Sequence, residues 1–400
     1  MPRCGLILHA AEPHGSGTTP PALYELLFRP LLSRVLDNCR AAGFDEGVVW
    51  RGIGDEAVQP LIPDSWKTDA SPFDYLKNSR NDCILLLYAD MPFLTPEDIT
   101  GLLDALWDGT KPFLLKGGDA MPGAGLYPRE MLLELLQAGK SPSDAASMKY
   151  SGTDPYAHDV EELALLRVKN RRTLSEATEI LRWDVLEKHL EKGVNIPVSD
   201  GVVIGEDVVI GPDSTIHPGT ILKGRTTIGD RCEIGPNSHL TDSTVGNGCT
   251  VISSYIDSSR VESRVKIGPM SNIRPGSRIS DGVKIGDFVE IKNSTIGVGT
   301  SVSHLTYIGD SDVGSGCNFG CGVVTVNYDG TSKHRTVVGD NTFVGCNVNL
   351  VAPVKLGDRV YAAAGTTVTE NVPDDALVIG RARQTVKEGW RKRKGLFEKK

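Results

Sequence analysis

The chain has 400 residues, of which 40% are hydrophobic and 24% are charged, and its formal net charge is −8. This length predicts two or three domains, and the acidic balance argues against a general nucleic-acid-binding protein. The eight cysteines include no C-x-x-C pair and no zinc-ligand spacing, so we expect free thiols in a reducing, cytoplasmic compartment. The sequence has neither a secretory signal pattern nor a run of about eighteen apolar residues, so we expect no membrane association.

Residues 1–172 alternate between strand-like and helix-like segments. Cys4–His9 and Cys83–Tyr88 are short apolar runs, which are typical of strands buried in a parallel sheet. Residues 31–42 and 95–107 have the spacing of amphipathic helices. This alternation predicts an α/β domain.

A linker helix is predicted over residues 173–193. Thr173 and Glu176 have the spacing of a capping box, and Gly193 is a natural helix terminator. An apolar stripe is formed by Leu174, Ala177, Leu181, Leu186 and Leu190.

Aliphatic residues recur at every sixth position through residues 194–380, which we expect to form one domain. The first run comprises Ile204, Ile210, Ile216, Leu222, Ile228, Ile234 and Leu240. The register resumes at Ile267, Ile273, Ile279, Ile285 and Ile291, and again at Val338, Val344, Leu350 and Leu356. A helix cannot place every sixth residue on one face, and a β-sandwich would show less regular turns. The period therefore predicts a β-solenoid of about ten coils, in which each six-residue stretch is a short strand and a corner.

Two segments depart from this repeat. Residues 327–335 cannot supply inward aliphatics and are predicted to protrude as a loop, where function often concentrates. Residues 381–400 form a basic tail with nine Lys or Arg and two Glu. This tail could attract a polyanionic ligand.

Residues 165–395 resemble the C-terminal half of the family of bifunctional N-acetylglucosamine-1-phosphate uridyltransferases / glucosamine-1-phosphate N-acetyltransferases. Six motifs occur in the family's order: Asn272-Ile-Arg-Pro-Gly276, Phe288-Val-Glu-Ile-Lys292, His304-Leu-Thr-Tyr307, Asn327-Tyr-Asp-Gly330, Phe343-Val-Gly345 and Lys387-Glu-Gly-Trp390. The resemblance implies a left-handed parallel β-helix, a homotrimer, and acetyl-CoA and an amino sugar phosphate as substrates.

The resemblance also implies the site residues. His304 matches the catalytic base, and imidazole can accept a proton near neutral pH. Arg274 and Lys292 lie eighteen residues apart, so we expect them to stack on adjacent coils and bind a sugar phosphate. Further sugar-phosphate contacts are implied for Tyr307, Asn318, Asn327, Tyr328 and Lys333.

Acetyl-CoA is expected in a groove between neighbouring solenoids, with a backbone N–H near Cys321 facing the thioester oxygen. Cys346, Ala364 and Arg381 match the family's other CoA-contact positions. The family commonly has Ala at position 321 and Ser at position 346. Backbone contacts would survive these changes, whereas a hydroxyl contact at position 346 would not.

The N-terminal domain resembles a shortened, degenerate sugar-nucleotide pyrophosphorylase of the Rossmann-like nucleotidyltransferase type. The resemblance rests on Gly5-Leu-Ile-Leu-His-Ala-Ala11, Arg29-Pro30-Leu31-Leu32 and Tyr88-Ala-Asp-Met-Pro92. Asp90 matches a metal-binding aspartate, so Mg²⁺ is expected only if this domain is active.

The phosphate-binding residues of that family are missing. The stretch 12–19 lacks the family's Arg, Pro21 replaces a Lys, and Lys169 replaces a metal-binding Asn. The uridine-reading Gln-Gly-Thr segment has no counterpart between Trp66 and Asp82. We therefore expect an acetyltransferase in UDP-N-acetylglucosamine biosynthesis whose uridylyltransferase activity is absent. The alternatives are a bifunctional enzyme, an N-acetyltransferase acting on another amino sugar phosphate, and a non-enzymatic trimeric scaffold.

Overall fold

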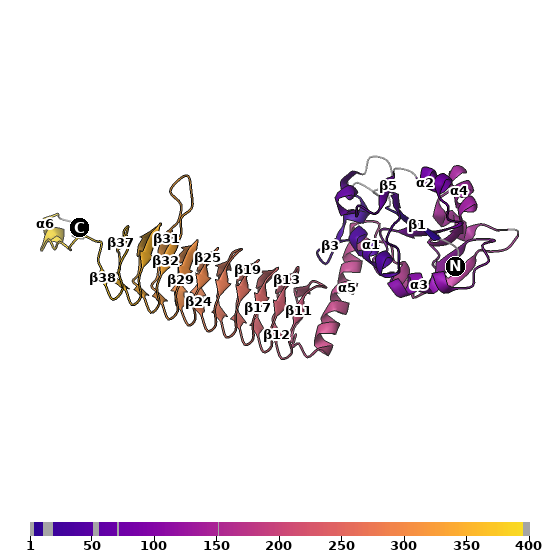
Figure 1. The fold of residues 1–400 in the computed structure, drawn as a ribbon. Helices are drawn as coiled ribbons and strands as arrows, with labels where there is room; N and C mark the ends of the chain where they lie inside the picture. The colour runs from indigo at the N-terminus through magenta and orange to yellow at the C-terminus, as the bar shows by residue number, and fades with distance from the viewer. Residues whose placement is uncertain (1–3, 11–18, 51–55, 70–71, 151, 395–400) are drawn as a thin grey trace. The chain divides into compact units, whose positions relative to one another are not determined.

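The chain folds into two compact units, Met1–Trp183 and Asp184–Lys400 (Figure 1). A computed structural model describes residues 4–10, 19–50, 56–69, 72–150 and 152–394. Most of the stretch 12–19, which the sequence singles out as a degenerate phosphate loop, and the last six residues of the basic tail lie outside the described residues. None of the helices in the described part combines the length and apolarity that crossing a membrane requires.

The described part of the first unit has a seven-stranded sheet with the order β5-β4-β1-β6-β8-β7-β9. Strand β8 runs antiparallel to both of its neighbours, and the other pairs are parallel. The strands are β1 (Cys4–His9), β4 (Val48–Trp50), β5 (Lys67–Asp69), β6 (Cys83–Tyr88), β7 (Phe113–Lys116), β8 (Gly125–Pro128) and β9 (Tyr156–Asp159). The predictions of β1 and β6 are confirmed at both ends, and these two largely apolar runs pair in register at the centre of the sheet.

Within the residues of this unit that the structure describes, four α-helices pack with the sheet: α1 (Leu31–Ala41), α2 (Phe73–Asn78), α3 (Pro96–Asp104) and α4 (Arg129–Gln137). A short hairpin, β2 (Glu25–Leu26) and β3 (Arg29–Pro30), precedes α1. Helix α3 begins with a capping box in which Thr95 and Asp98 exchange side-chain and backbone hydrogen bonds. The unit is therefore a Rossmann-like α/β domain, as the sequence predicts.

Helix α5 (Arg171–Glu191) begins earlier than the sequence pattern suggests. The predicted capping box between Thr173 and Glu176 is wrong. Asn170 caps the helix instead, because its Oδ1 accepts from the Thr173 N–H at 3.0 Å and its own N–H donates to Thr173 Oγ1 at 3.1 Å. Asn and Thr are both good capping residues, and the pair closest to the chain's entry into the helix forms the cap.

The second unit consists of short parallel strands from β10 (Val203–Ile204) to β38 (Leu377–Val378), arranged in three sheets. The first sheet has ten strands from β10 to β37, the second nine from β11 to β35, and the third ten from β12 to β38. Nearly every strand pairs with the strand three places later, so the chain winds around a three-sided core. This is a left-handed parallel β-helix of hexapeptide repeats.

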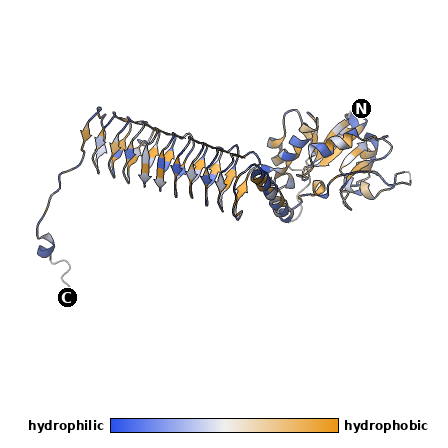
Figure 2. Cartoon of the chain, turned by 90° about the horizontal axis from the view of Figure 1, so that it is seen from below, coloured by the Kyte–Doolittle hydropathy of each residue, from blue (hydrophilic) through white to orange (hydrophobic). Residues whose placement is uncertain are grey.

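The period of six is confirmed by burial. The predicted aliphatics from Ile204 to Leu356 all lie inside the coils, and each is at most 5% exposed. Apolar segments recur along the ladder of strands, coloured orange in Figure 2. Residues 327–335 leave the coils between β31 (Val324–Val326) and β32 (Thr336–Val338), and this protruding loop is visible beside β31 in Figure 1.

Candidate functional site

Three cations gather where the first sheet turns towards the second. Arg274 and Lys292 follow the paired residues Ile273 of β22 (Asn272–Ile273) and Ile291 of β25 (Glu290–Lys292), so they occupy successive coils as predicted. The ammonium group of Lys333, which comes from the protruding loop, approaches Lys292. Together with Arg274 it lowers the pKa of Lys292 below that of an ordinary lysine. Arg274 Nη1 donates to Glu290 Oε1 at 2.7 Å.

A tyrosine and an asparagine lie beside these cations. Tyr307 begins β28 (Tyr307–Gly309), one coil after Glu290, and its hydroxyl accepts from Asn327 Nδ2 at 3.4 Å. Asn327 also donates to Asp310, which is buried. Burial alone would raise the pKa of Asp310, but hydrogen bonds from Asn293 and Asn327 and the nearby lysines hold it below its usual value.

The protruding loop is ordered by one carboxylate. Asp329 accepts from the N–H groups of Thr331 and Ser332, at 2.8 and 2.7 Å, and its other oxygen lies 2.7 Å from His334 Nε2. These contacts hold the pKa of Asp329 well below its usual range. Tyr328, a predicted substrate contact, donates its hydroxyl to the Gly330 carbonyl within the loop, so its hydrogen bond does not reach the cation cluster.

His304 lies at the corner between the third and first sheets, at the end of β27 (Ser301–His304). Its Nδ1 is 2.9 Å from Asp287 Oδ1, one coil earlier at the end of β24 (Lys284–Asp287). A hydrogen bond from the backbone and the contact with His304 lower the pKa of Asp287. When Nδ1 carries the proton that is shared with Asp287, Nε2 can accept another. Asp287 was missed by sequence reasoning, although its distance of seventeen residues from His304 equals one coil.

The predicted CoA-contact positions continue this column. Strand registers from β27 through β30 (Asn318–Phe319), β33 (Phe343–Val344) and β36 (Tyr361–Ala362) align His304, Cys321, Cys346 and Ala364 on consecutive coils of the same corner. The Asn347 N–H donates to the Cys321 carbonyl at 2.8 Å, which fixes the spacing between the two coils. Strand β38 (Leu377–Val378) pairs with β36, and the Gly380 N–H donates to Thr366 Oγ1, so residue 380 lies one coil after Ala364. Arg381 is the next residue and stands at the end of the column.

One predicted substrate residue lies elsewhere. Asn318 is in β30 of the third sheet, whereas Tyr307 and the cations belong to the first sheet and its edge. Asn318 is exposed, but a single chain places it on a different face of the coils from the cation cluster.

Next to His304, the same corner carries bulky apolar side chains. Met270, Phe288 and Leu305 stack on successive coils and are 60%, 58% and 58% exposed. Each has a left-handed backbone, with φ of +56°, +58° and +45°. Such conformations are unusual for bulky residues and tend to be retained where function requires them.

In the first unit, Asp90 is fully buried and engaged by Arg167. Arg167 Nε and Nη2 donate to the two carboxylate oxygens at 2.8 and 2.9 Å, and the guanidinium lies 3.6 Å from the centre of the Tyr88 ring. The Val168 N–H also donates to the Asp90 carbonyl at 2.8 Å. Lys169, the predicted substitute for a metal ligand, is exposed.

These residues do not fit a divalent cation. A guanidinium occupies both oxygens of Asp90, and the part of the chain that the structure describes contains no cluster of three His, Cys, Asp or Glu suited to a metal. His9 ends strand β1, next to the end of β6 that Asp90 follows, and its ring lies against Trp50 with the two ring centres 4.1 Å apart. Burial and the Arg167 charge lower the pKa of His9 to about 4, so it is neutral at pH 7.

The chain is similar to known proteins along its whole length. It is 56% identical, over 93% of each chain, to the bifunctional protein GlmU of Caldanaerobacter subterraneus subsp. tengcongensis. It is 50% identical, over the full length of both chains, to the bifunctional protein GlmU of Clostridium acetobutylicum. A nucleotidyl transferase from Methanothermobacter thermautotroptrophicus matches 45% of this chain and 98% of its own, with 16% identity and a TM-score of 0.38. No family model matches the chain.

Proposed function

Because the chain belongs to the family of bifunctional GlmU proteins, we propose that its solenoid unit transfers the acetyl group of acetyl-CoA to the amino group of glucosamine-1-phosphate. The observation that carries this proposal is the pair of Asp287 and His304 at the corner where the first sheet begins, with Tyr307 on that sheet and the cations at its other edge. A base that is oriented by a carboxylate suits proton removal from an amino group, and the cations suit the phosphate of the same sugar.

In this proposal His304 Nε2 takes a proton from the amino group while the nitrogen attacks the thioester carbonyl. The C–N bond forms, the C–S bond breaks, and the proton passes to the departing CoA sulfur. Asp287 keeps the proton on Nδ1 and stabilises the imidazolium that forms transiently. In the described part of the chain the Cys321 N–H donates to no protein acceptor, so it is available to the oxyanion.

The sugar phosphate is assigned to the cation cluster. Lys292 and Lys333 face each other with Arg274 nearby, and the buried carboxylate of Asp310 interacts with both lysines. Mutual repulsion of these cations is relieved when a dianion binds among them. Tyr307 and Asn327 would orient the sugar hydroxyl groups.

We also propose a homotrimer. Asn318 and the Tyr307 cluster lie on different sheets, so a second copy is needed for both to contact one sugar. The exposed column of Met270, Phe288 and Leu305 provides apolar surface for such an interface. Acetyl-CoA would lie along the column from Cys321 to Arg381. A monomer with full activity, as seen by light scattering at the assay concentration, would contradict this arrangement.

The test of acetyl transfer is release of the CoA thiol from acetyl-CoA with glucosamine-1-phosphate as acceptor. We expect release with this acceptor and loss of release in His304→Ala. Faster turnover of a different amino sugar phosphate would change the acceptor, and no release with any of them would favour the non-enzymatic scaffold.

We further propose that the first unit does not transfer uridylyl groups. The proposal is supported by the buried pair of Asp90 and Arg167, by Pro21 in place of a lysine, and by the exposed Lys169. Proline has no N–H and cannot imitate the missing cation. UTP-dependent pyrophosphate release with N-acetylglucosamine-1-phosphate and magnesium is expected to be at background. Release that Asp90→Ala abolishes would establish the bifunctional alternative, which the family name favours.

A further inference from the structure

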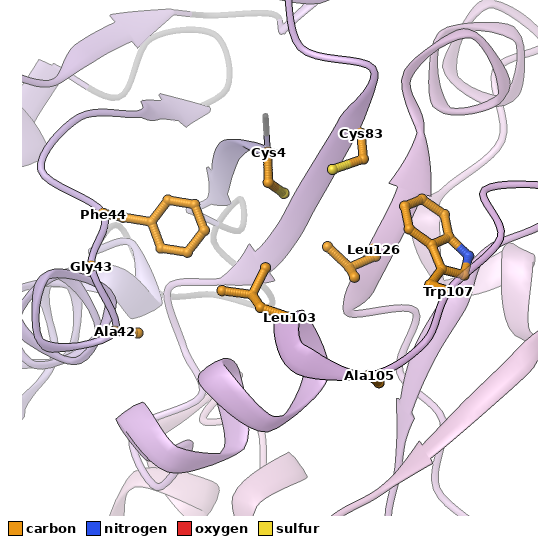
Figure 3. Close-up of a pocket in the computed structure, with 9 residues that line it drawn as sticks. All are labelled: Cys4, Ala42, Gly43, Phe44, Cys83, Leu103, Ala105, Trp107 and Leu126. Atoms are coloured by element: carbon orange, nitrogen blue, oxygen red, sulfur yellow. The ribbon is translucent and has the colours of Figure 1, made fainter. Parts of the chain in front are cut away.

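The first unit contains an apolar cavity at the N-terminal ends of the central strands β1 and β6. Asp90 follows the opposite, C-terminal end of β6. The volume of the cavity is about 180 Å³, and it opens between the ends of α1 and α3 (Figure 3). Phe44, Leu103, Trp107 and Leu126 supply its walls. The Trp107 indole is fixed because its Nε1 donates to the Lys111 carbonyl at 2.8 Å. An apolar cavity of about 150 Å³ in another protein binds benzene, so this volume suits a ligand with one ring.

Two thiols line the cavity. Cys4 and Cys83 are direct partners in the register of the parallel strands β1 and β6, so their side chains emerge on the same face, one strand spacing apart. The hydrogen bond between the two thiols raises the pKa of Cys4 and lowers that of Cys83. Cys83 is therefore the sulfur that more readily carries negative charge.

The combination of features selects the ligand. A ring alone would fit the walls, but it would leave the paired thiols without a role. A soft ion alone would meet the thiols, but it would not use the aromatic walls. Soft centres bind thiolates preferentially. We propose that this cavity is a binding site for small apolar molecules that carry a thiophilic atom, with Cys4 and Cys83 as a two-thiol clamp; a trivalent aryl arsenical is the test ligand.

The clamp reaction is balanced without an oxidant. Phenylarsine oxide and two thiols give a dithioarsenite and one water: two As–S bonds form, and the arsenic-bound oxygen leaves with both thiol protons. Arsenic remains trivalent. The site uses none of the residues assigned to acetyl transfer, and it lies at the other end of β1 and β6 from His9 and Tyr88.

The experiment measures adducts of phenylarsine oxide on the full chain by native mass spectrometry. After binding, the protein is denatured and alkylated, and the protected cysteines are identified by peptide mapping. Two further pairs of cysteines stack on adjacent coils of the second unit, Cys232 with Cys249 and Cys321 with Cys346, so the background variant is C232A/C249A/C321A/C346S. We expect one adduct per chain in this background, with Cys4 and Cys83 protected, and loss of the tight adduct in Cys4→Ala and in Cys83→Ala.

Ala105→Phe tests the cavity while leaving both thiols intact. Ala105 lines the cavity, and a ring at this position would occupy the space of the ligand's ring. We expect the affinity for phenylarsine oxide to fall about tenfold or more, because the buried area of one phenyl group is lost. Arsenite, which has no ring, should lose less affinity. An adduct that maps to other cysteines, or unchanged affinity in Ala105→Phe with a native circular dichroism spectrum, would overturn the proposal.

Discussion

Removal of Arg167 should destabilise the first unit strongly. Asp90 is fully buried and the Arg167 side chain is 13% exposed, so water cannot replace the guanidinium in Arg167→Ala. Breaking a buried ion pair from one side costs about 3–5 kcal/mol, because a charge remains without a partner. For a unit of 183 residues, each kcal/mol lowers the midpoint by about 2–4 °C, so a decrease of about 6–20 °C is expected.

Replacing both partners should restore most of this loss. In the double variant Asp90→Leu/Arg167→Met no buried charge remains, and apolar replacement of a buried pair is often neutral. The double-mutant cycle should therefore give a coupling of several kcal/mol between the two positions. This outcome would separate the ion pair from the general packing of the Arg167 side chain against Tyr88.

Unfolding of the first unit can be followed by tryptophan fluorescence, because four of the five tryptophans lie within residues 1–183. Arg172→Ala is the matched control: Arg172 is 88% exposed and pairs with Glu176 on the surface of α5. This control should change stability by less than about 0.5 kcal/mol. If Arg167→Ala behaves like Arg172→Ala, then the guanidinium does not hold Asp90 in solution. The carboxylate would in that case be open to a metal ion.

Three further predictions concern the solenoid site. His304→Ala should lower kcat by about 10²–10⁴-fold with an unchanged circular dichroism spectrum; wild-type turnover would exclude His304 as the base. Asp287→Asn should lower kcat by about tenfold at constant KM, since the carboxylate is half exposed and water partly replaces it; a change in KM alone would contradict its orienting role. The KM for the sugar phosphate should rise with pH, because Lys292 has a lowered pKa and loses its charge earlier than an ordinary lysine. Lys333→Met removes the main cause of that shift, so it should move this rise to higher pH; an identical pH profile would refute the contact.

The solenoid was predictable from the sequence because its order is local. Each coil repeats the same inward position, so Ile273 and Ile291 report both the core and the spacing of the residues beside them. That spacing placed Arg274 and Lys292 on adjacent coils. Asp287 follows the same rule, but no charge pattern marks it, and coil length varies between positions.

The first unit was predictable only in part, because its decisive contacts are not local. The central strands β1 and β6 are marked by unbroken apolar runs. Arg167, by contrast, follows Asp90 by 77 residues and meets it only through the folded sheet. The sequence identifies Lys169 as the cation that replaces a metal-binding Asn. The cation that contacts the carboxylate of Asp90 is Arg167, two positions earlier. The predicted cap of α5 was wrong for a different reason, since two possible capping pairs, 170/173 and 173/176, lie within seven residues.

If the first unit does not catalyse uridylyl transfer, as we propose, the pair of Asp90 and Arg167 explains how the buried carboxylate can remain. A buried aspartate without a counter-charge is strongly destabilising, whether the lost charge was an ion or a side chain. Arg167 supplies a positive charge and two hydrogen bonds at this position, so Asp90 contributes to stability and its presence alone is no sign of catalysis. Removal of Arg167 alone is therefore not expected to create a metal site, because it leaves the buried Asp90 carboxylate unpaired and destabilises the unit. Only a variant that removes the guanidinium and adds a further carboxylate or amide ligand, measured in high magnesium, would test whether the unit can still hold a divalent ion.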